Sequence, residues 1–413
     1  MRRAVTAFLR LMLRLFFRRI ELAGLDHIPA DAPVMFAANH PNGLVDPLFF
    51  LCFAPRRVSV LAKAPLFRYT LIGSFVRALD SIPVYRKQDQ TAGSNEETFT
   101  RAREVLRSGG SIVIFPEGTT HSEPQLRELK TGAARIALGA ELPGLLIVPA
   151  GIYYTAKQTF RSEVLVWFGK PITVEGEVRE LTAEIEKQLD SVTLQADSRA
   201  ALALIARAEE IFSANSRQPL AAEFELRRRF VDGYHFLAER DPQRLEQLAS
   251  MIRQYESELG GARLDPEDLT PHVQWRAVVR VLMLFPVAVV GIATHLLPYL
   301  AVDFFAKRLS KNEDEMTATI KFVASLLFYP LIWFVLAAIV WRFWSGGAGL
   351  ITLIVVPILG YVALRFIEQL DEISGTARAI LHKTRSRVAH ARLVSHRQRI
   401  RDEILAVAEG MNR

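Results

Sequence analysis

Hydrophobic positions between residues 33 and 172 fall into short runs that are separated by turn residues and amphipathic segments. The runs are VMFAAN, VSVLAK, SIPVYR, SIVIFPEG, LLIVPAGIYY and EVLVWFGKPI. Apolar runs of this length are typical of strands, and their alternation with amphipathic segments is typical of an α/β domain. We therefore predict an α/β domain over residues 23–180, with polar strand ends along one edge of its sheet.

The next segment, residues 181–275, is rich in Ala, Leu, Glu, Arg and Gln at helical spacing and is predicted to be a helical region without chemistry of its own. Within it, DPQRLEQLASMIRQYESELGG is predicted to be one helix, which Asp241 caps and Gly260 ends. Its charged residues are most simply a solvated face.

Hydrophobic membrane segments are predicted within residues 276–366, because three uncharged stretches there have the roughly 20 residues that a spanning helix requires. The second and third stretches are separated by Arg342, and WSGGAG follows it, which predicts a helical hairpin. The three stretches are 281–302, 322–341 and 343–364.

Charge on either side of these stretches bears on their topology. The loop over 303–321 contains Lys307, Arg308, Lys311 and Lys321, and the predicted helical tail over 367–413 is basic. Lys and Arg in short loops favour the cytoplasm. We therefore expect residues 281–302, which contain Pro286 and Pro298, to dip into the membrane and return, while 322–364 crosses twice. The chain would then be an integral membrane protein with its α/β domain on the cytoplasmic face.

Within the predicted helical segment 1–22, the first twenty residues, MRRAVTAFLRLMLRLFFRRI, contain six arginines and no acid. Arginines at positions 10, 14 and 18 recur every fourth residue among apolar positions, which predicts an amphipathic helix in the plane of an anionic membrane. A secretory signal would need an unbroken apolar core and a small-residue cleavage site. The alternative is an ordinary packing helix with an arginine stripe.

Composition agrees with a membrane setting. Half of the 413 residues are apolar and the formal net charge is +7, which points to an anionic surface or anionic substrates. Nucleic acid is not an expected partner, because the basic residues flank apolar segments and no aromatic-rich basic motif occurs. Cys52 is the one cysteine, so no intramolecular disulfide or thiolate metal cluster can form, and a reducing compartment fits.

The segment FAANHPNGLVDPLFF, residues 36–50, places His40 and Asp46 after a strand-like run and around a Pro-Asn-Gly turn. Burying either group costs free energy unless a specific partner satisfies it. An imidazole oriented by a carboxylate can take a proton from a hydroxyl group. A capping aspartate beside a surface histidine would look the same, and no further ligands stand at the spacing of a metal site.

Three further blocks follow in order. SIPVYR ends in Arg86, FPEGTTHS contains Glu117, Gly118 and Thr119, and IVPAGI contains Pro149. Together with the first block, the sequence over residues 36–172 strongly resembles the glycerolipid acyltransferase family, which includes lysophosphatidic acid and glycerol-3-phosphate acyltransferases. The resemblance implies a mixed sheet flanked by helices, followed by helical and membrane-embedded regions.

The resemblance also implies roles for the matching residues. His40 would be the general base and Asp46 its orienting partner, while the phosphate of the acceptor would be bound by forked guanidinium and backbone N–H donors. Pro149 and Lys63 would belong to the acyl-donor side, and Lys130 and Lys170 are further candidates for phosphate groups. The acceptor-binding residues would be Asn39, Asn42, Arg86, Glu117, Gly118 and Thr119.

Two departures from the common family pattern bear on the acceptor. Five residues separate His40 from Asp46 where four are usual, which is similar to the branch of fungal glycerol-3-phosphate acyltransferases. Thr120 and His121 stand where an arginine usually follows the third block, so one phosphate contact is missing or replaced.

The expected reaction is direct attack of an acceptor hydroxyl on the thioester of acyl-CoA or acyl carrier protein, without a cofactor or metal. No acyl-enzyme is expected, because Cys52 and the serines lack a matching base. The acceptor would be glycerol 3-phosphate, its 1-acyl derivative or another lysophospholipid. Two alternatives stay open: a phospholipid-lysophospholipid transacylase that uses the same pair, and a catalytically inactive membrane scaffold.

Overall fold

The structure is a computed structural model that describes residues 2–68, 70–85, 95–214, 218–269, 275–310 and 314–411. The chain divides into two compact units. The first comprises residues 1–199 with the short segments 219–224 and 312–319, and the second comprises the rest.

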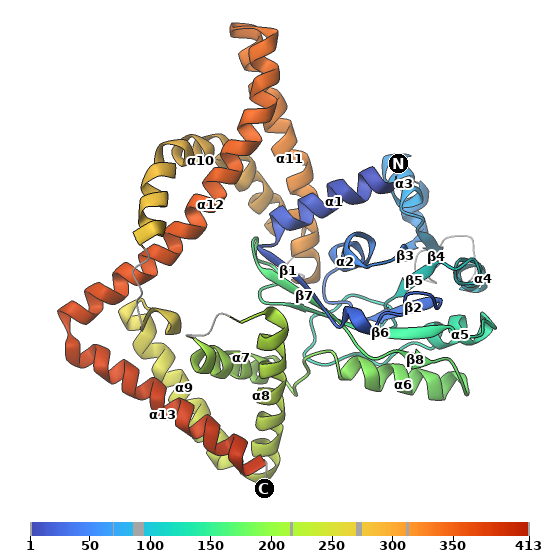
Figure 1. Cartoon of the computed structure of the whole chain (residues 1–413), viewed down its shortest axis with the longest axis horizontal. Helices are drawn as coiled ribbons and strands as arrows, with labels where there is room; N and C mark the ends of the chain where they lie inside the picture. Colours follow the sequence, from blue (N-terminus) through green and yellow to red (C-terminus); the bar gives the residue numbers. More distant parts are fainter. Residues whose placement is uncertain are drawn as a thin grey trace. The chain divides into compact units, whose positions relative to one another are not determined.

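The first unit is built around one eight-stranded sheet (Figure 1). The strand order is β1-β7-β6-β2-β5-β3-β4, and β8 also pairs with β6. All six apolar runs of the sequence form strands at the expected places. The strands are β1 (Arg19–Ala23), β2 (Val34–Ala38), β3 (Val58–Lys63), β4 (Ile82–Val84), β5 (Ser111–Ile114), β6 (Leu146–Tyr154), β7 (Glu163–Phe168) and β8 (Ile172–Thr173).

The sheet is mixed, as expected. Strands β2, β3, β4, β5 and β6 are parallel to their neighbours on the path from β6 to β4, whereas β7 and β8 run antiparallel to β6. In the central pair, Ala38 of β2 lies opposite Ala150 of β6. Because β6 continues four residues beyond that point, its carboxyl end projects past β2 on the edge where β2 also ends.

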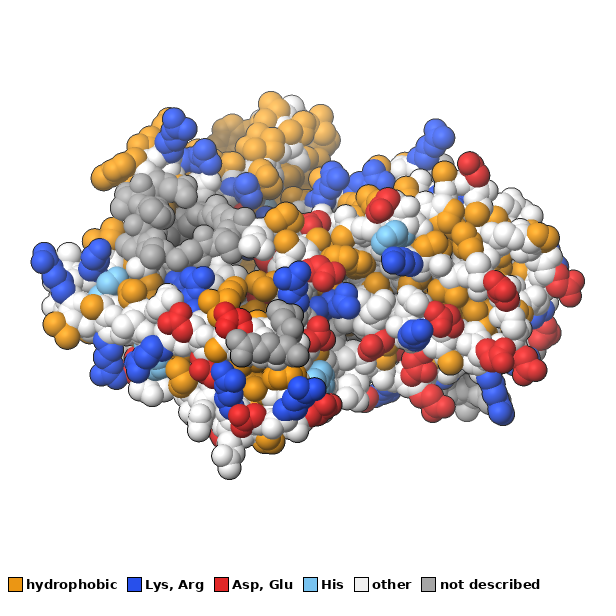
Figure 2. Space-filling view, turned by 60° about the horizontal axis from the view of Figure 1, so that its bottom comes forward, with side chains coloured by type: hydrophobic (Ala, Val, Ile, Leu, Met, Phe, Trp, Pro, Cys, Tyr) orange, Lys and Arg blue, Asp and Glu red, His pale blue; other side chains and the backbone are white. Residues whose placement is uncertain are grey.

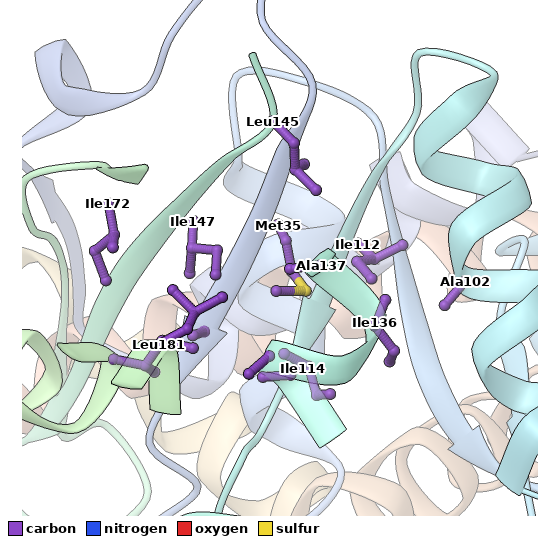
Figure 3. Close-up of a cluster of buried hydrophobic side chains, with 14 of the residues drawn as sticks. Met35, Ala102, Ile112, Ile114, Ile136, Ala137, Leu145, Ile147, Ile172 and Leu181 are labelled. Carbon is purple, nitrogen blue, oxygen red and sulfur yellow. The ribbon is translucent and has the colours of Figure 1, made fainter. Parts of the chain in front are cut away.

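Helices α4 (Asn95–Arg107), α5 (Gly132–Gly139) and α6 (Val178–Asp190) cover one face of the sheet. Alternate residues of each strand point to this face, as the pleat requires. Figure 3 shows the resulting core, in which strand side chains such as Met35 and Ile147 pack against Ile136 and Leu181 from the helices. The first unit also contains α3 (Thr70–Ala78) and the 3₁₀ turns η1 (Leu25–His27) and η2 (Ala64–Arg68).

The opposite side chains of the central strands pack with α2 (Val45–Phe53). Phe36 of β2 lies with its ring centroid 5.6 Å from that of Phe50. Helix α1 (Arg2–Phe16) packs on α2 and buries Leu9 and Leu13, while Phe8 is 51% and Leu11 is 55% exposed. The helix therefore has one apolar face against the domain and further apolar residues on its surface.

The helix predicted over residues 1–22 is shorter than expected. Helix α1 ends at Phe16, and Arg19–Ala23 form β1, which pairs in parallel with β7. Glu163 of β7 holds this strand in place, because its two carboxylate oxygens accept from Arg18 and from Arg19, each at 2.6 Å. Arginines that looked like a continuing helical stripe thus form ion pairs at the edge of the sheet.

The second unit contains α7 (Arg199–Ser213), most of α8 (Leu220–Arg240), α9 (Pro242–Ala262), η4 (Pro266–Leu269) and α13 (Arg387–Met411). The expected cap of α9 is confirmed, since Asp241 accepts from the backbone N–H of Arg244 at 3.1 Å. The expected end at Gly260 is wrong, because the helix runs to Ala262 and ends at Arg263 in a left-handed conformation. These helices enclose a core with Ile211, Leu237, Ile252, Tyr255 and Ile400.

Among the described residues, three helices are long and apolar enough to cross a membrane. They are α10 (Trp275–Leu309), α11 (Asp314–Phe343) and α12 (Gly346–Arg385). Pro286 and Pro298 both lie inside α10, which Figure 1 draws as an arch. The hairpin turn lies at the expected place, where Ser345 caps α12 by accepting from the N–H of Ala348. The surface of this region is largely hydrophobic in Figure 2, with Leu331 and Ile354 more than half exposed.

Candidate active site

The predicted site residues come from strand ends on one edge of the sheet. Strands β2, β5, β3, β4 and β6 are parallel, so their carboxyl ends lie along the same edge. Asn39 and His40 follow β2 directly, and the block around Glu117 follows β5, which is the neighbour of β2. Parallel pairing therefore brings together blocks that are nearly 80 residues apart in the chain.

His40 and Asp46 meet as the sequence predicts. Nδ1 of His40 lies 2.9 Å from Oδ2 of Asp46, across the turn that leads from β2 into α2. Asp46 sits in the first turn of α2 and its side chain is completely buried, whereas that of His40 is 13% exposed. In the described part of the chain, Nε2 of His40 makes no hydrogen bond, so this nitrogen is free to accept a proton.

Two further contacts hold His40, one through its ring and one through its backbone. Its ring stacks on Phe115 with 4.1 Å between centroids and 19° between planes. Its backbone N–H donates to Oε1 of Glu117 at 2.9 Å. Three contacts from two segments, α2 and the turn after β5, thus set the position of His40.

The Asp46 carboxylate accepts from three donors. Besides His40, Oδ2 accepts from the backbone N–H of Asn42 at 2.7 Å, and Oδ1 accepts from the hydroxyl of Tyr154 at 2.5 Å. Burial raises the pKa of Asp46 above its ordinary value, although the hydrogen bonds from His40, Tyr154 and Asn42 oppose the rise. Burial, followed by the charge of Asp46, raises the pKa of Tyr154 well above its ordinary value, so this hydroxyl stays protonated as a donor.

Asn39 and Glu117, which were predicted to bind the acceptor, have side chains that bind the protein itself. The amide of Asn39 accepts from the N–H of Ile152 at 2.7 Å and donates to its carbonyl at 3.2 Å, which ties the end of β2 to β6. The buried carboxylate of Glu117 accepts from His40 and from the N–H of Arg127 at 3.2 Å, and it pairs with His121. We expect any contact of these segments with substrate to come through neighbouring backbone groups.

The turn after β5 has the close backbone approach that the sequence predicts. Gly118 adopts φ +72°, and a β-carbon there would lie 2.5 Å from Nζ of Lys130 and 2.7 Å from its Cδ. The lysine side chain therefore lies directly over the glycine. Thr119 is partly exposed beside them. The N–H of Gly118 donates to the carbonyl of Phe115 at 2.9 Å, so the ammonium group of Lys130 is what this turn offers to an anion.

The remaining predicted residues make no hydrogen bond with the His40 side chain in the described part of the chain. Lys63 ends β3, two strands from β2 on the same edge, and is exposed. Pro149 is buried on β6 opposite Ala37 of β2, and Asn42 is fully buried. Lys170 lines a separate open groove beside α6. Arg86 lies outside the described residues, so its predicted role stays a prediction.

Tyr154 and Phe115 belong to the site but were not singled out from the sequence, and His121, noted only as standing where an arginine is usual, pairs with Glu117. Tyr154 could have been found from the register of the sheet, because extending the Ala38–Ala150 pair by four residues brings position 154 level with the turn after β2. No local motif marks it, and the register is known only once β2 and β6 are paired. Phe115 directly precedes the third block and was available as a neighbour of Glu117.

A small cavity lies beside the imidazole. Its lining includes Asn39, His40, Pro41, Glu117, His121 and Gln195. Within the described ranges, no three His, Cys, Asp or Glu side chains form a group that could hold a metal ion. Cys52 is buried on α2, and burial raises the pKa of its thiol to about 12, so a thiolate nucleophile is not available there.

Comparison with known proteins places this domain among enzymes. The family model described as Acyltransferase matches residues 19–153. Glycerol-3-phosphate O-acyltransferase 2 of Saccharomyces cerevisiae is 32% identical over 187 residues, which cover 41% of this chain and 25% of the yeast protein. The 1-acyl-sn-glycerol-3-phosphate acyltransferase of Borreliella burgdorferi is 31% identical over 137 residues, covering 33% of this chain and 52% of the bacterial protein.

These likenesses are partial in extent. The matches cover 25% to 49% of the length of three curated relatives of this chain, less than two thirds in each case. Among solved structures, the 1-acyl-sn-glycerophosphate acyltransferase of Thermotoga maritima aligns with a TM-score of 0.38 and 20% identity, over 46% of this chain and 78% of that chain.

Proposed function

Since its acyltransferase domain makes this chain a member of the glycerolipid acyltransferase family, we propose that it acylates glycerol 3-phosphate or 1-acylglycerol 3-phosphate at a membrane. The donor would be the thioester of acyl-CoA or acyl carrier protein. One observation carries the proposal: the buried Asp46 holds Nδ1 of His40 at 2.9 Å while Nε2 stays free of partners in the described part of the chain.

The geometry supports general-base catalysis by His40. A carboxylate at Nδ1 keeps the proton on that nitrogen, so Nε2 carries the lone pair that can accept the hydroxyl proton. As the proton moves to Nε2, the acceptor oxygen forms a bond to the thioester carbonyl carbon. Asp46 then faces an imidazolium ion and stabilises its positive charge.

Collapse of the tetrahedral intermediate completes the transfer. The carbon–sulfur bond breaks, its electron pair leaves with sulfur, and the proton on Nε2 of His40 passes to the departing thiolate. The products are an ester and a free thiol, and His40 returns to its starting state. No covalent acyl-enzyme is required, which agrees with the protonated and buried state of Cys52.

The acceptor phosphate would bind where N–H donors and cations gather. In the described structure, the ammonium group of Lys130 lies over the turn at Gly118 and Thr119 and is one such cation. Arg86 is the predicted guanidinium partner from the second block. We propose that Glu117 shapes this turn and supports His40 through its backbone contact, because a buried carboxylate would repel a phosphate.

Glycerol 3-phosphate is the acceptor that we favour. The five-residue spacing between His40 and Asp46 supports it, as does the likeness to a yeast protein named glycerol-3-phosphate O-acyltransferase 2. The 1-acyl derivative is the second acceptor to test, because the similar bacterial protein is named for it.

The membrane setting is supported by α10, α11 and α12, which are long and apolar enough to span a bilayer. We propose that α10 enters and returns at its prolines, so that the acyltransferase domain and the basic tail both face the cytoplasm. The exposed Phe8 and Leu11 of α1, with arginines around them, would contact the lipid surface.

The proposal is tested with full-length protein in lipid nanodiscs, radiolabelled acyl-CoA, a free-thiol assay and a panel of phosphate-bearing acceptors. We expect labelled lipid and free CoA in equal amounts, and we expect His40→Ala to remove turnover while the protein stays folded. His235→Ala, on α8, is the matched control and should keep wild-type turnover.

Normal acylation by His40→Ala would contradict the assignment of the base. Acylation in a parallel assay with a labelled phospholipid donor, with no thiol released from acyl-CoA, would instead identify a transacylase.

A further inference from the structure

We propose that Tyr154 is a positioning residue of the reaction, whose hydroxyl fixes the Asp46 carboxylate and thereby sets the proton affinity of the His40–Asp46 pair. The inference rests on the proposed function. Tyr154 lies one residue beyond the segment that the family model matches. It is the last residue of β6, and the pairing of β6 with β2 brings it beside Asp46.

The three hydrogen bonds that Asp46 accepts are distributed unequally over its two carboxylate oxygens. Oδ2 receives two, from Nδ1 of His40 at 2.9 Å and from the N–H of Asn42 at 2.7 Å. Tyr154 is the donor to Oδ1, at 2.5 Å, and it comes from a different strand. Without it the carboxylate would be held at one oxygen and could rotate about its bond to Cβ.

The tyrosine ring is held independently of its hydroxyl. Its centroid lies 5.9 Å from the ring of Phe17 and 6.2 Å from that of Phe49. These aromatic contacts survive in phenylalanine, which has the same ring. Tyr154→Phe therefore removes one hydrogen bond to Asp46 and leaves the packing of β6 against α2 in place.

The electrostatic effect of that removal has a definite sign. A hydrogen bond to the ionised carboxylate favours its charged form, so its loss lets the buried pair hold a proton to higher pH. A shift of one pH unit corresponds to about 1.4 kcal/mol, which is close to the lower end of the range of about 1.5–3 kcal/mol that hydrogen bonds to charged groups contribute. The acid limb of the pH–rate profile, where the base loses its proton, should therefore move to higher pH.

Other charged groups near the pair do not change with this substitution. Glu117 contacts the backbone N–H of His40 and pairs with His121. Lys157 donates to the carbonyl of Pro41 at 3.3 Å. None of these three contacts involves the Asp46 carboxylate or the Tyr154 hydroxyl. Their effect on the His40–Asp46 pair should therefore be the same in wild type and in Tyr154→Phe.

The experiment measures kcat/KM against pH for wild type and Tyr154→Phe in nanodiscs. We expect the acid limb to move to higher pH by about one unit in Tyr154→Phe. At pH values below the limb, kcat/KM should then be roughly tenfold lower than in wild type. KM for acceptor and donor should change little. Tyr153→Phe is the matched control, because the preceding residue points to the other face of the strand and contacts Phe224. Its limb should stay at the wild-type position.

A second measurement does not depend on turnover. Diethyl pyrocarbonate modifies unprotonated imidazole, and peptide mass spectrometry follows its reaction with His40 as a function of pH. The midpoint should rise by about one pH unit in Tyr154→Phe and should not move when Tyr154→Phe is added to Asp46→Asn.

An unchanged midpoint and an unchanged acid limb in Tyr154→Phe would overturn the inference, even if turnover fell at every pH. The same holds if the shift persists in the Asp46→Asn background, because Tyr154 would then act by another route. Failure of the proposed function gives a different result, namely no acylation by wild type or full acylation by His40→Ala.

Discussion

Replacing Asp46 with asparagine isolates the charge of the buried carboxylate. The oxygen of asparagine can keep the place of Oδ2, where it accepts from His40 and from the N–H of Asn42, while its NH₂ group donates to the oxygen of Tyr154, whose hydroxyl can turn. The geometry and the tautomer of the imidazole are then retained. What is lost is the negative charge that faces the imidazolium ion during the reaction.

The size of that loss follows from the contact. Nδ1 and Oδ2 lie 2.9 Å apart, and both side chains are shielded from solvent, at 13% and 0% exposure. Two unit charges with centres about 4 Å apart interact with about 4 kcal/mol at an effective dielectric constant near 20. At about 1.4 kcal/mol for each factor of ten, we expect kcat of Asp46→Asn to fall by roughly 10³.

The assay is acylation of glycerol 3-phosphate by full-length protein in nanodiscs, with kcat and KM measured separately. Loss of the charge acts on the transition state, so KM should change by less than about threefold. Thermal unfolding of the same sample reports whether the fold survives. A folded variant that keeps more than about a third of wild-type kcat would refute the role of the Asp46 charge.

Further expectations concern the turn, the thiol and the topology. Gly118→Ala should lower the unfolding temperature by several degrees and raise KM for the acceptor, because φ is +72° and the new methyl group would meet Lys130; an unchanged KM would argue against phosphate binding there. Cys52→Ala should keep kcat within about twofold, since a buried thiol with a pKa of about 12 is no nucleophile, and a large loss measured in the same assay would reopen an acyl-enzyme. The cysteine-free Cys52→Ala chain can also test the topology with an impermeant maleimide, which labels only cysteines outside intact cells. It should label Ser345→Cys, in the turn before α12, but not Lys307→Cys, near the end of α10. Labelling of Lys307→Cys alone would mean that α10 crosses the membrane.

Local patterns were sufficient to predict most of the acyltransferase domain. Apolar runs bounded by turns gave six strands, and the Pro-Asn-Gly turn gave the start of α2 near Asp46. The cap of α9 at Asp241 was also predictable, because a capping side chain bonds within its own turn. In each case the deciding interaction lies within a few residues of the signal.

Errors arose where a distant segment decides the structure. The helix with the arginine stripe was predicted to continue through residue 22, but pairing with β7 and its Glu163 makes residues 19–23 a strand. The donor Tyr154 depends on the register between β2 and β6, and the inward turn of Glu117 depends on backbone groups that fold around it. Such contacts form only in the tertiary structure, and no periodic pattern in the sequence marks them.

The pairing of β1 with β7 has a consequence for biosynthesis. Arg19 and its partner Glu163 are 144 residues apart, so the N-terminus leaves the ribosome on the order of ten seconds before its neighbouring strand has been made. During that interval the sheet cannot yet hold α1 through β1, and its apolar and arginine side chains are available to any nearby anionic lipid. If α1 binds lipid as proposed, we expect that contact to begin before the acyltransferase domain has closed.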